Sequence, residues 1–207
     1  YGAGAEAAVI GSAGEQRVRF ASIMAGNGAA GGKGFGAVMG AKNLKAVVVR
    51  AERSVLPPAK PEAFRAVTRD ITALWRGETS ERYWMDAMLE GVEKVKTTPC
   101  FACPGICGRG LYTDSRGESG YGKNCASAYS YAYAEKALSG GIGEATFRAT
   151  QLANRHGLCC NEINMLVEWV PQAVQSGLID GPAVGLDSAD YGSCEWITRL
   201  IDIVIQR

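Results

Sequence analysis

The chain has 207 residues, of which 47% are hydrophobic and 21% are charged, and its formal net charge is +1. A chain of this size and apolar content can bury a full core and need not be disordered. No Lys/Arg cluster stands out, and no run approaches the roughly 18 consecutive apolar residues of a membrane span. We therefore expect a soluble cytoplasmic protein with reduced cysteines, and neither nucleic acid nor membrane as a partner.

The first fifty residues carry the signals of short strands and glycine turns. Ala8 to Ile10 and Leu44 to Val49 are apolar runs typical of buried strands, and Val18 to Met24 is rich in apolar residues. A glycine-rich segment occupies residues 26–40. Its backbone can present N–H and C=O groups to a phosphate or to a cation bound by that phosphate, but a tight turn explains the same composition more simply.

Helical periodicity begins after Pro57, Pro58 and Pro61, which mark the best candidate for a domain boundary. We expect helices over six ranges: 62–74, 83–95, 127–138, 144–156, 162–176 and 193–205. The sequence therefore predicts an α+β fold. Residues 1–56 would form the β-rich end of one domain, and residues 57–207 would form a multihelical, mostly α domain.

Three thiols form a C-x-x-C-x-x-x-C run at Cys100, Cys103 and Cys107. Spacings of two and three place the sulfurs inside one tight loop, where they can converge on a metal centre. We interpret the run as a [4Fe–4S] site that lacks its fourth ligand. A structural zinc site and free thiols remain alternatives, although zinc usually requires a second C-x-x-C or a His pair and this chain has one histidine.

Two further segments complete a resemblance to the tungsten-dependent aldehyde ferredoxin oxidoreductase family. The stretch from Gly14 to Arg50, with its Gly-Ala-Val-Met-Gly run at 36–40, is similar to that family, and 154–159 resembles its pterin-binding D-x-x-G-L-(C/D) motif. The cysteine run falls where the family holds three cluster ligands. Because the chain opens without methionine and closes inside an amphipathic helix, we expect it to be a piece of a longer polypeptide.

The resemblance implies a tungsten (or molybdenum) bis-pterin with a neighbouring [4Fe–4S] cluster. The implied reaction oxidises aldehydes, as small-molecule substrates, to carboxylates and passes electrons to ferredoxin or another low-potential electron carrier. Cofactors of this kind carry the redox chemistry, while the protein supplies placement and electrostatics. Homo-oligomers or electron-transfer subunits are further expected partners.

The resemblance also assigns residues. It places a Mg²⁺ that bridges the pterin phosphates near the backbone of Ala30 and Gly31. It maps contacts to a pterin ring onto four motif residues, which are Asn154, Gly157, Leu158 and Cys159. The fourth cluster cysteine would lie beyond Arg207.

The chain departs from the family pattern at three places. Asn154 stands where the family usually has Asp, and Gly32-Lys33 replaces its usual Arg-Gly. Cys125 stands where aldehyde-oxidising relatives carry a glutamate beside the metal. A thiolate there could ligate tungsten, which resembles the class II benzoyl-coenzyme A reductase branch and suggests low-potential acyl-coenzyme A reduction as an alternative. A buried structural cysteine and a non-enzymatic iron–sulfur electron-transfer module also remain open.

The other candidate residues favour packing over chemistry. Cys159 and Cys160 are adjacent, so one of them is expected in the core, and Cys194 beside Trp196 is expected to pack. His156 has no cysteine or carboxylate at metal spacing. The alternating tyrosines at 129, 131 and 133 are likewise expected to pack.

Overall fold

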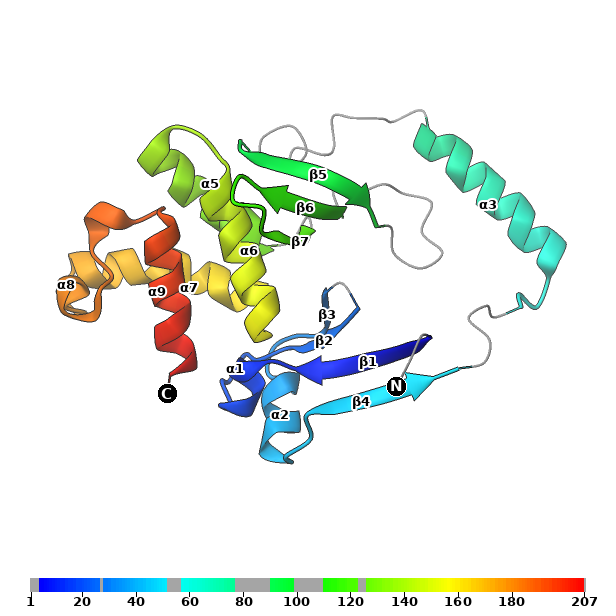
Figure 1. The fold of residues 1–207 in the computed structure, drawn as a ribbon, viewed down its shortest axis with the longest axis horizontal. Helices are drawn as coiled ribbons and strands as arrows, with labels where there is room; N and C mark the ends of the chain where they lie inside the picture. Colours follow the sequence, from blue (N-terminus) through cyan, green and yellow to red (C-terminus); the bar gives the residue numbers. More distant parts are fainter. Residues whose placement is uncertain are drawn as a thin grey trace.

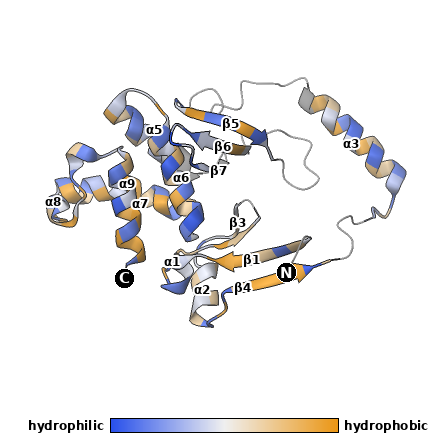
Figure 2. Ribbon diagram, in the orientation of Figure 1, coloured by the Kyte–Doolittle hydropathy of each residue, from blue (hydrophilic) through white to orange (hydrophobic). Residues whose placement is uncertain are grey.

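The computed structural model describes residues 4–26, 28–51, 57–76, 90–98, 110–122 and 126–206 (Figure 1). The N-terminal part is a four-stranded antiparallel sheet in the order β3-β2-β1-β4. Its strands are β1 (Ala5–Ile10), β2 (Ile23–Ala25), β3 (Gly28–Gly31) and β4 (Ala46–Arg50). Figure 2 shows the hydrophobic composition of β1 and β4, which lie side by side. The predicted strands around residues 8–10 and 44–49 are confirmed.

Two short helices pack at one end of this sheet, namely α1 (Ser12–Glu15) and α2 (Phe35–Ala41). The glycine-rich segment is therefore only partly a turn, because its second half is a helix. A Cβ on Gly40 would lie 1.8 Å from the carbonyl oxygen of Gly14, and one on Gly36 would lie 2.7 Å from the carbonyl oxygen of Ser22. These glycines are required because α2 approaches neighbouring backbone more closely than any side chain allows.

A second antiparallel sheet contains β5 (Val92–Thr97), β6 (Gly110–Asp114) and β7 (Ser119–Gly122). The predicted helix over 83–95 is wrong for residues 92–95, which belong to β5, and residues 83–89 lie outside the described ranges. Gly91 has φ +74 and separates this strand from the preceding residues. The hydrogen-bonding partner of β5 is β6, a strand distant in sequence, so local helical periodicity could not reveal the pairing.

The other predicted helices are confirmed. Gly157, with φ +69, ends α6, and the side chain of Ser193 caps α9 by accepting a hydrogen bond from the Trp196 N–H. None of the helices in the described ranges is both long and apolar enough to cross a membrane. The helical elements are α3 (Pro61–Arg76), α5 (Ala126–Ser139), α6 (Glu144–His156), α7 (Cys160–Gln175), α8 (Gly181–Val184), the 3₁₀ turn η1 (Ser188–Asp190) and α9 (Cys194–Ile205).

The hydrophobic core is centred on α5, α6, α7 and α9 and extends into the N-terminal part. Trp196, Ile197 and Leu152 are buried in it together with Val18 and Ala21. The fold class α+β is confirmed. The domain boundary at residues 56 and 57 stays a prediction.

Glu135 fastens α5 to the start of α6 although its side chain is buried. Its carboxylate accepts hydrogen bonds from the backbone N–H groups of Gly143, Ala145 and Thr146 and from the Thr146 hydroxyl, at 2.6–3.0 Å. The first backbone N–H groups of a helix have no partner within the helix, so a buried carboxylate supplies the acceptors that α6 lacks.

Candidate functional site

The structure brings the glycine-rich segment and the 154–159 motif together, although more than a hundred residues separate them. Ala21 and Leu158 form an isolated antiparallel bridge. The Ser22 N–H donates to the Gly157 carbonyl at 2.6 Å, and the Cys159 N–H donates to the Phe20 carbonyl at 3.0 Å. Residues 20–22, which precede β2, are thus hydrogen-bonded to the loop between α6 and α7.

Gly32 lies directly beside Cys159 at this junction. A Cβ on Gly32 would be 3.2 Å from Cys159 Sγ and 3.8 Å from Ser22 Oγ. Cys159 is only 6% exposed, and the hydroxyl of Ser22 is buried without a hydrogen-bond partner among the described residues. A buried hydroxyl without a partner is unusual and marks the junction as a place for a further polar group.

Leu158 and Gly157 serve the fold first. Leu158 is 1% exposed and belongs to the hydrophobic core. A Cβ on Gly157 would lie 3.0 Å from the Gly11 nitrogen, and one on Gly11 would lie 2.3 Å from the His156 carbonyl oxygen. Gly157 and Leu158 of the motif are therefore required by the close packing of α6 against the loop before α1.

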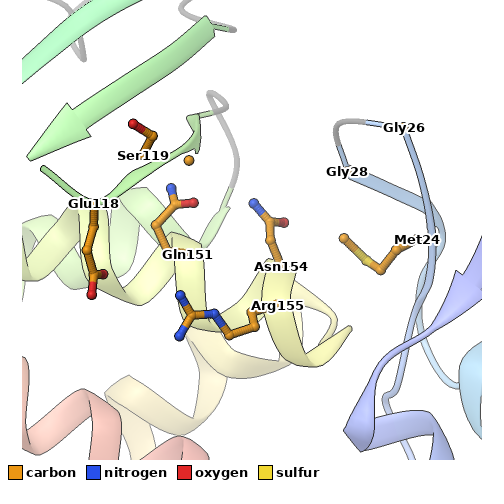
Figure 3. Close-up of a pocket in the computed structure, with 9 residues that line it drawn as sticks. Met24, Gly26, Gly28, Glu118, Ser119, Gln151, Asn154 and Arg155 are labelled. Carbon is orange, nitrogen blue, oxygen red and sulfur yellow. The ribbon is translucent and has the colours of Figure 1, made fainter.

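Asn154 faces a cavity of about 280 Å³ between the hairpin of β2 and β3, strand β7 and helix α6. In Figure 3, Asn154 and Gln151 point from α6 toward this space, and Met24 points toward it from the facing hairpin. Sequence reasoning had singled out Asn154, and Gly26 and Gly28 only as part of the glycine-rich segment, and it missed the other lining residues. The available signal was the i, i+3 spacing of Gln151 and Asn154, which puts both side chains on one helix face. The lining residues are Met24, Gly26, Gly28, Glu118, Ser119, Gly120, Gln151, Asn154 and Arg155.

Ala30 and Gly31 lie in β3, the outermost described strand of the N-terminal sheet, and Ala30 is exposed. A Cβ on Gly31 would meet its nearest neighbours at 3.7 Å, which is ordinary van der Waals contact. Unlike Gly36 and Gly40, Gly31 is therefore not required by packing within the described residues. A small side chain would fit there in contact with Phe35 and Ile23.

Lys33 follows this strand in a left-handed backbone conformation, with φ +55. Its ammonium lies 3.5 Å from the Glu162 carboxylate, and both groups are solvent-accessible. Such an exposed ion pair contributes little, so it does not offset the strain of a side chain at positive φ. The adjacent Gly34 also has positive φ, at +101.

Lys33→Gly should raise the free energy of unfolding by about 1 kcal/mol, because glycine adopts positive φ without strain. The comparison variant is Asn43→Gly, since Asn43 also has positive φ, at +53. Asparagine tolerates this conformation, so the Asn43→Gly gain should be smaller. Urea unfolding of both variants measures the difference; equal gains would contradict the strain assigned to Lys33.

His156 is tied to the N-terminal part rather than to a metal. Its Nδ1 and the Ser12 hydroxyl share a hydrogen bond of 2.7 Å. Burial lowers the pKa of His156, and the nearby Arg155 and Arg148 lower it further, while Asp202 opposes them. The ring is therefore held neutral where α6 docks on α1.

Stability should fall as the pH drops below 6.5, the ordinary pKa of histidine. A lowered pKa in the folded state means that the unfolded chain binds the proton at a higher pH than the folded chain does. The free energy of unfolding therefore decreases as the pH falls from the unfolded pKa to the folded pKa. The chain has one histidine, so His156→Asn should flatten the profile between pH 8 and pH 5.5. Denaturant unfolding across that range tests this, and an unchanged slope in the variant would refute it.

The predicted cluster ligands Cys100, Cys103 and Cys107, and also Cys125, lie outside the described residues. Within the described ranges, no group of three or more His, Cys, Asp or Glu side chains is arranged to hold a metal ion.

The remaining candidates behave as packing residues or lie at the surface. Burial raises the pKa of the Cys194 thiol, with Glu195 adding to the rise, which disfavours the thiolate form. Tyr131 is fully buried and donates its hydroxyl hydrogen bond to the Ser193 carbonyl, whereas Tyr133 is exposed. The prediction of ordinary packing is thus confirmed for Tyr131 and wrong for Tyr133.

Comparison with known proteins shows which family this chain is similar to. Residues 1–51 match the family described as aldehyde ferredoxin oxidoreductase, N-terminal domain. A tungsten-containing aldehyde ferredoxin oxidoreductase of Pyrococcus horikoshii is 35% identical over 54% of this chain and 24% of its own length. The aliphatic sulfonate oxidoreductase WOR-like subunit of Pyrococcus furiosus is 40% identical over 36% of this chain and 12% of its own length.

A solved structure matches almost the whole chain. It is the active site complex BamBC of benzoyl coenzyme A reductase in complex with 1,5-dienoyl-CoA, with a TM-score of 0.74 and 22% identity over 98% of this chain and 37% of that one. At this identity the match shows a shared fold.

The relatives define a class of oxidoreductases. The chain is similar to the aldehyde ferredoxin oxidoreductase family, whose N-terminal domain matches residues 1–51. It spans about a quarter of the length of the curated tungsten-containing relatives it matches, 24% for the two Pyrococcus proteins of P. horikoshii and P. abyssi.

Proposed function

We propose that this chain is part of a tungsten (or molybdenum) bis-pterin, [4Fe–4S] oxidoreductase that oxidises aldehydes to carboxylates and passes electrons to ferredoxin. One observation carries the proposal. The two segments assigned to pterin phosphate and pterin ring, around Gly31 and around Asn154, belong to one continuous region joined through the bridge between Ala21 and Leu158. Neither segment has a sequence-local reason to lie near the other.

The residues present fit a pterin cofactor at three points. The backbone at Gly31 has room for a close neighbour, because a Cβ there would meet only ordinary contacts. The buried Ser22 hydroxyl is without a partner among the described residues. The cavity at Asn154 holds about 280 Å³, close to the lower end of small-molecule sites. Each point is a place where a polar, partly planar ligand would complete the structure.

Roles follow from this fit. When bound, the metal–pterin group supplies the two-electron redox chemistry. Backbone at Ala30 and Gly31 would face the magnesium-bridged phosphates, and the Asn154 amide would meet a pterin ring edge with a neutral hydrogen bond. Cys100, Cys103 and Cys107 would hold the cluster, with a fourth ligand from elsewhere.

Analysis of the native-length protein, purified without oxygen, tests the function. We expect tungsten or molybdenum, four irons for each polypeptide, an extractable fluorescent pterin, and aldehyde-dependent reduction of a viologen dye. Iron without pterin would favour a non-enzymatic electron-transfer module. Colourless protein with one zinc for each polypeptide would contradict the redox function altogether.

Low-potential reduction of an acyl-coenzyme A substrate is the second candidate, and Cys125 is the observation that favours it. A thiolate is a soft donor suited to tungsten. Cys125→Ser should then remove one sulfur from the metal coordination seen by X-ray absorption, while pterin content stays constant. An unchanged sulfur count would remove the ligand role and leave aldehyde oxidation as the better candidate.

A further inference from the structure

Helix α3 carries a stripe of large apolar side chains that the described elements leave open. The stripe consists of Phe64, Val67, Ile71 and Leu74, whose spacings of three and four residues place them along one side of the helix. Their exposed fractions run from 38% for Ile71 to 74% for Leu74. Figure 1 shows α3 apart from both sheets and from the other labelled helices, and Figure 2 shows hydrophobic and hydrophilic bands alternating along it. A row of exposed apolar side chains of this kind marks an interaction surface.

The opposite side of α3 is charged. At about 100° per residue, Arg65, Arg69 and Arg76 fall on the side away from the stripe, and Arg65 and Arg69 are exposed. A helix with this division lies with its apolar side on another surface and keeps its charges in water. An isolated helix of 16 residues is also marginally stable in water. The stability of α3 therefore depends on an element that covers the stripe.

The spacing of the stripe indicates the shape of its occupant. The steps from Phe64 to Leu74 are three, four and three residues, which is the a/d repeat of two helices packed side by side. Because a helix rises about 1.5 Å per residue, the stripe is about 15 Å long. Ala63 and Thr68 flank it and are small, so the axis of a second helix can come close. A single helix of about three turns matches this surface.

The size of the stripe favours an occupant within the same polypeptide. The a/d repeat extends over about two heptads, whereas coiled coils between separate chains run for about three to four heptads or more. Association of separate molecules also costs translational and rotational freedom, which a segment of the same polypeptide has already given up. The matched chain of the BamBC structure aligns with 98% of this chain, yet that match covers 37% of the longer chain. Most of the longer polypeptide thus lies outside the region that contains α3.

We infer that the apolar stripe of α3 is an internal docking surface, covered by an amphipathic helix from the part of the native-length polypeptide that lies outside these 207 residues. The covering helix presents apolar side chains at the same spacings of three and four residues and is polar on its far side. It would tie the remainder of the polypeptide to the segment that follows β4. This role is independent of the cofactor and of the reaction.

Photocrosslinking of the native-length protein identifies the occupant. Val67 is replaced by p-benzoylphenylalanine, the purified protein is irradiated, and the linked peptide is identified by mass spectrometry. We expect a link within one polypeptide to a segment outside the 207 residues. The control carries the same probe at Arg69, on the charged side, and should give no defined link. A product of doubled mass, a link to another of the 207 residues, or no defined link at Val67 would each overturn the inference.

Hydrogen exchange of the unmodified native-length protein gives a second test, which does not depend on how the Val67 variant folds. The α3 amides should exchange at least about a hundredfold more slowly than those of an unstructured chain, because a covered helix opens rarely. The protection should be unchanged on roughly tenfold dilution, since an internal contact does not depend on concentration. Rapid exchange, protection lost on dilution, or protection gained only with phosphatidylcholine–phosphatidylserine vesicles would contradict an internal partner. The last two outcomes would assign the stripe to a second copy and to a lipid surface, respectively.

Discussion

Gly40→Ala is expected to lower the free energy of unfolding by about 3 kcal/mol, at the upper end of the usual cost of overpacking. The new methyl group would lie 1.8 Å from the carbonyl oxygen of Gly14 and 2.8 Å from its carbonyl carbon. Both atoms are backbone of α1, so no side chain can move aside. The gain in helix propensity, about 1 kcal/mol for an exposed helix interior, is too small to offset separation of the two helices.

The matched control lies in the same glycine-rich segment. Gly31→Ala adds the same methyl group where the nearest atoms are 3.7 Å away, so stability should change by less than about 0.5 kcal/mol. Urea unfolding followed by circular dichroism measures both variants. Equal losses at Gly40 and Gly31 would contradict the close approach of α1 and α2 and would reduce the segment to an ordinary glycine-rich loop.

Glu135→Ala is expected to cost about 3 kcal/mol or more, because each buried donor left without a partner costs about 1–3 kcal/mol. The change removes four hydrogen bonds at once and leaves the first turn of α6 without acceptors. It also opens a gap between α5 and α6. The unfolding transition of the purified protein should move to markedly lower urea concentration.

Two further variants identify the cause of that loss. Glu135→Gln keeps the volume but exchanges one acceptor for a donor that faces backbone N–H groups, so it should retain only part of the stability. Glu195→Gln removes an exposed carboxylate from the first turn of α9 and should cost no more than about 1 kcal/mol, the worth of a charge near a helix end. A loss at Glu195 as large as that at Glu135 would show that charge, not buried hydrogen bonding, is responsible.

The helices were predictable because their signals are local. The range 144–156 matches α6 at both ends, since Gly157 supplies the left-handed residue that ends a helix. The range 193–205 differs from α9 by one residue, the capping Ser193. In each case propensity, periodicity and capping agree within a few residues of chain, so tertiary context has nothing to override.

Strand β5 was not predictable in the same way. Its sequence, Val-Glu-Lys-Val-Lys-Thr, also suits a helix, and the strand exists because β6 supplies its hydrogen-bond partners from residues 110–114. The pairing also shifts register between Lys94 and Lys96. A partner so far along the chain leaves no trace in local periodicity.

The candidate site was predictable only in part. Motif spacing identified Asn154, but the cavity it faces is built from a hairpin, a strand and a helix that lie far apart in the sequence. Neither Gln151 nor Gly120 belongs to a recognisable motif, and only the structure shows that these two residues are in contact. The cysteines assigned to the cluster, Cys100, Cys103 and Cys107, stay a sequence prediction.

By itself the amino-acid sequence determined most of the described helices, their approximate ends and the family that the chain resembles, because capping, periodicity and motif spacing act within short stretches. Only the tertiary structure decided which glycines are required by packing: Gly36 and Gly40 lie against other backbone, while a side chain at Gly31 would make only ordinary van der Waals contacts. Glycine looks the same at every position in a sequence, and its purpose depends on what occupies the volume where a side chain would be.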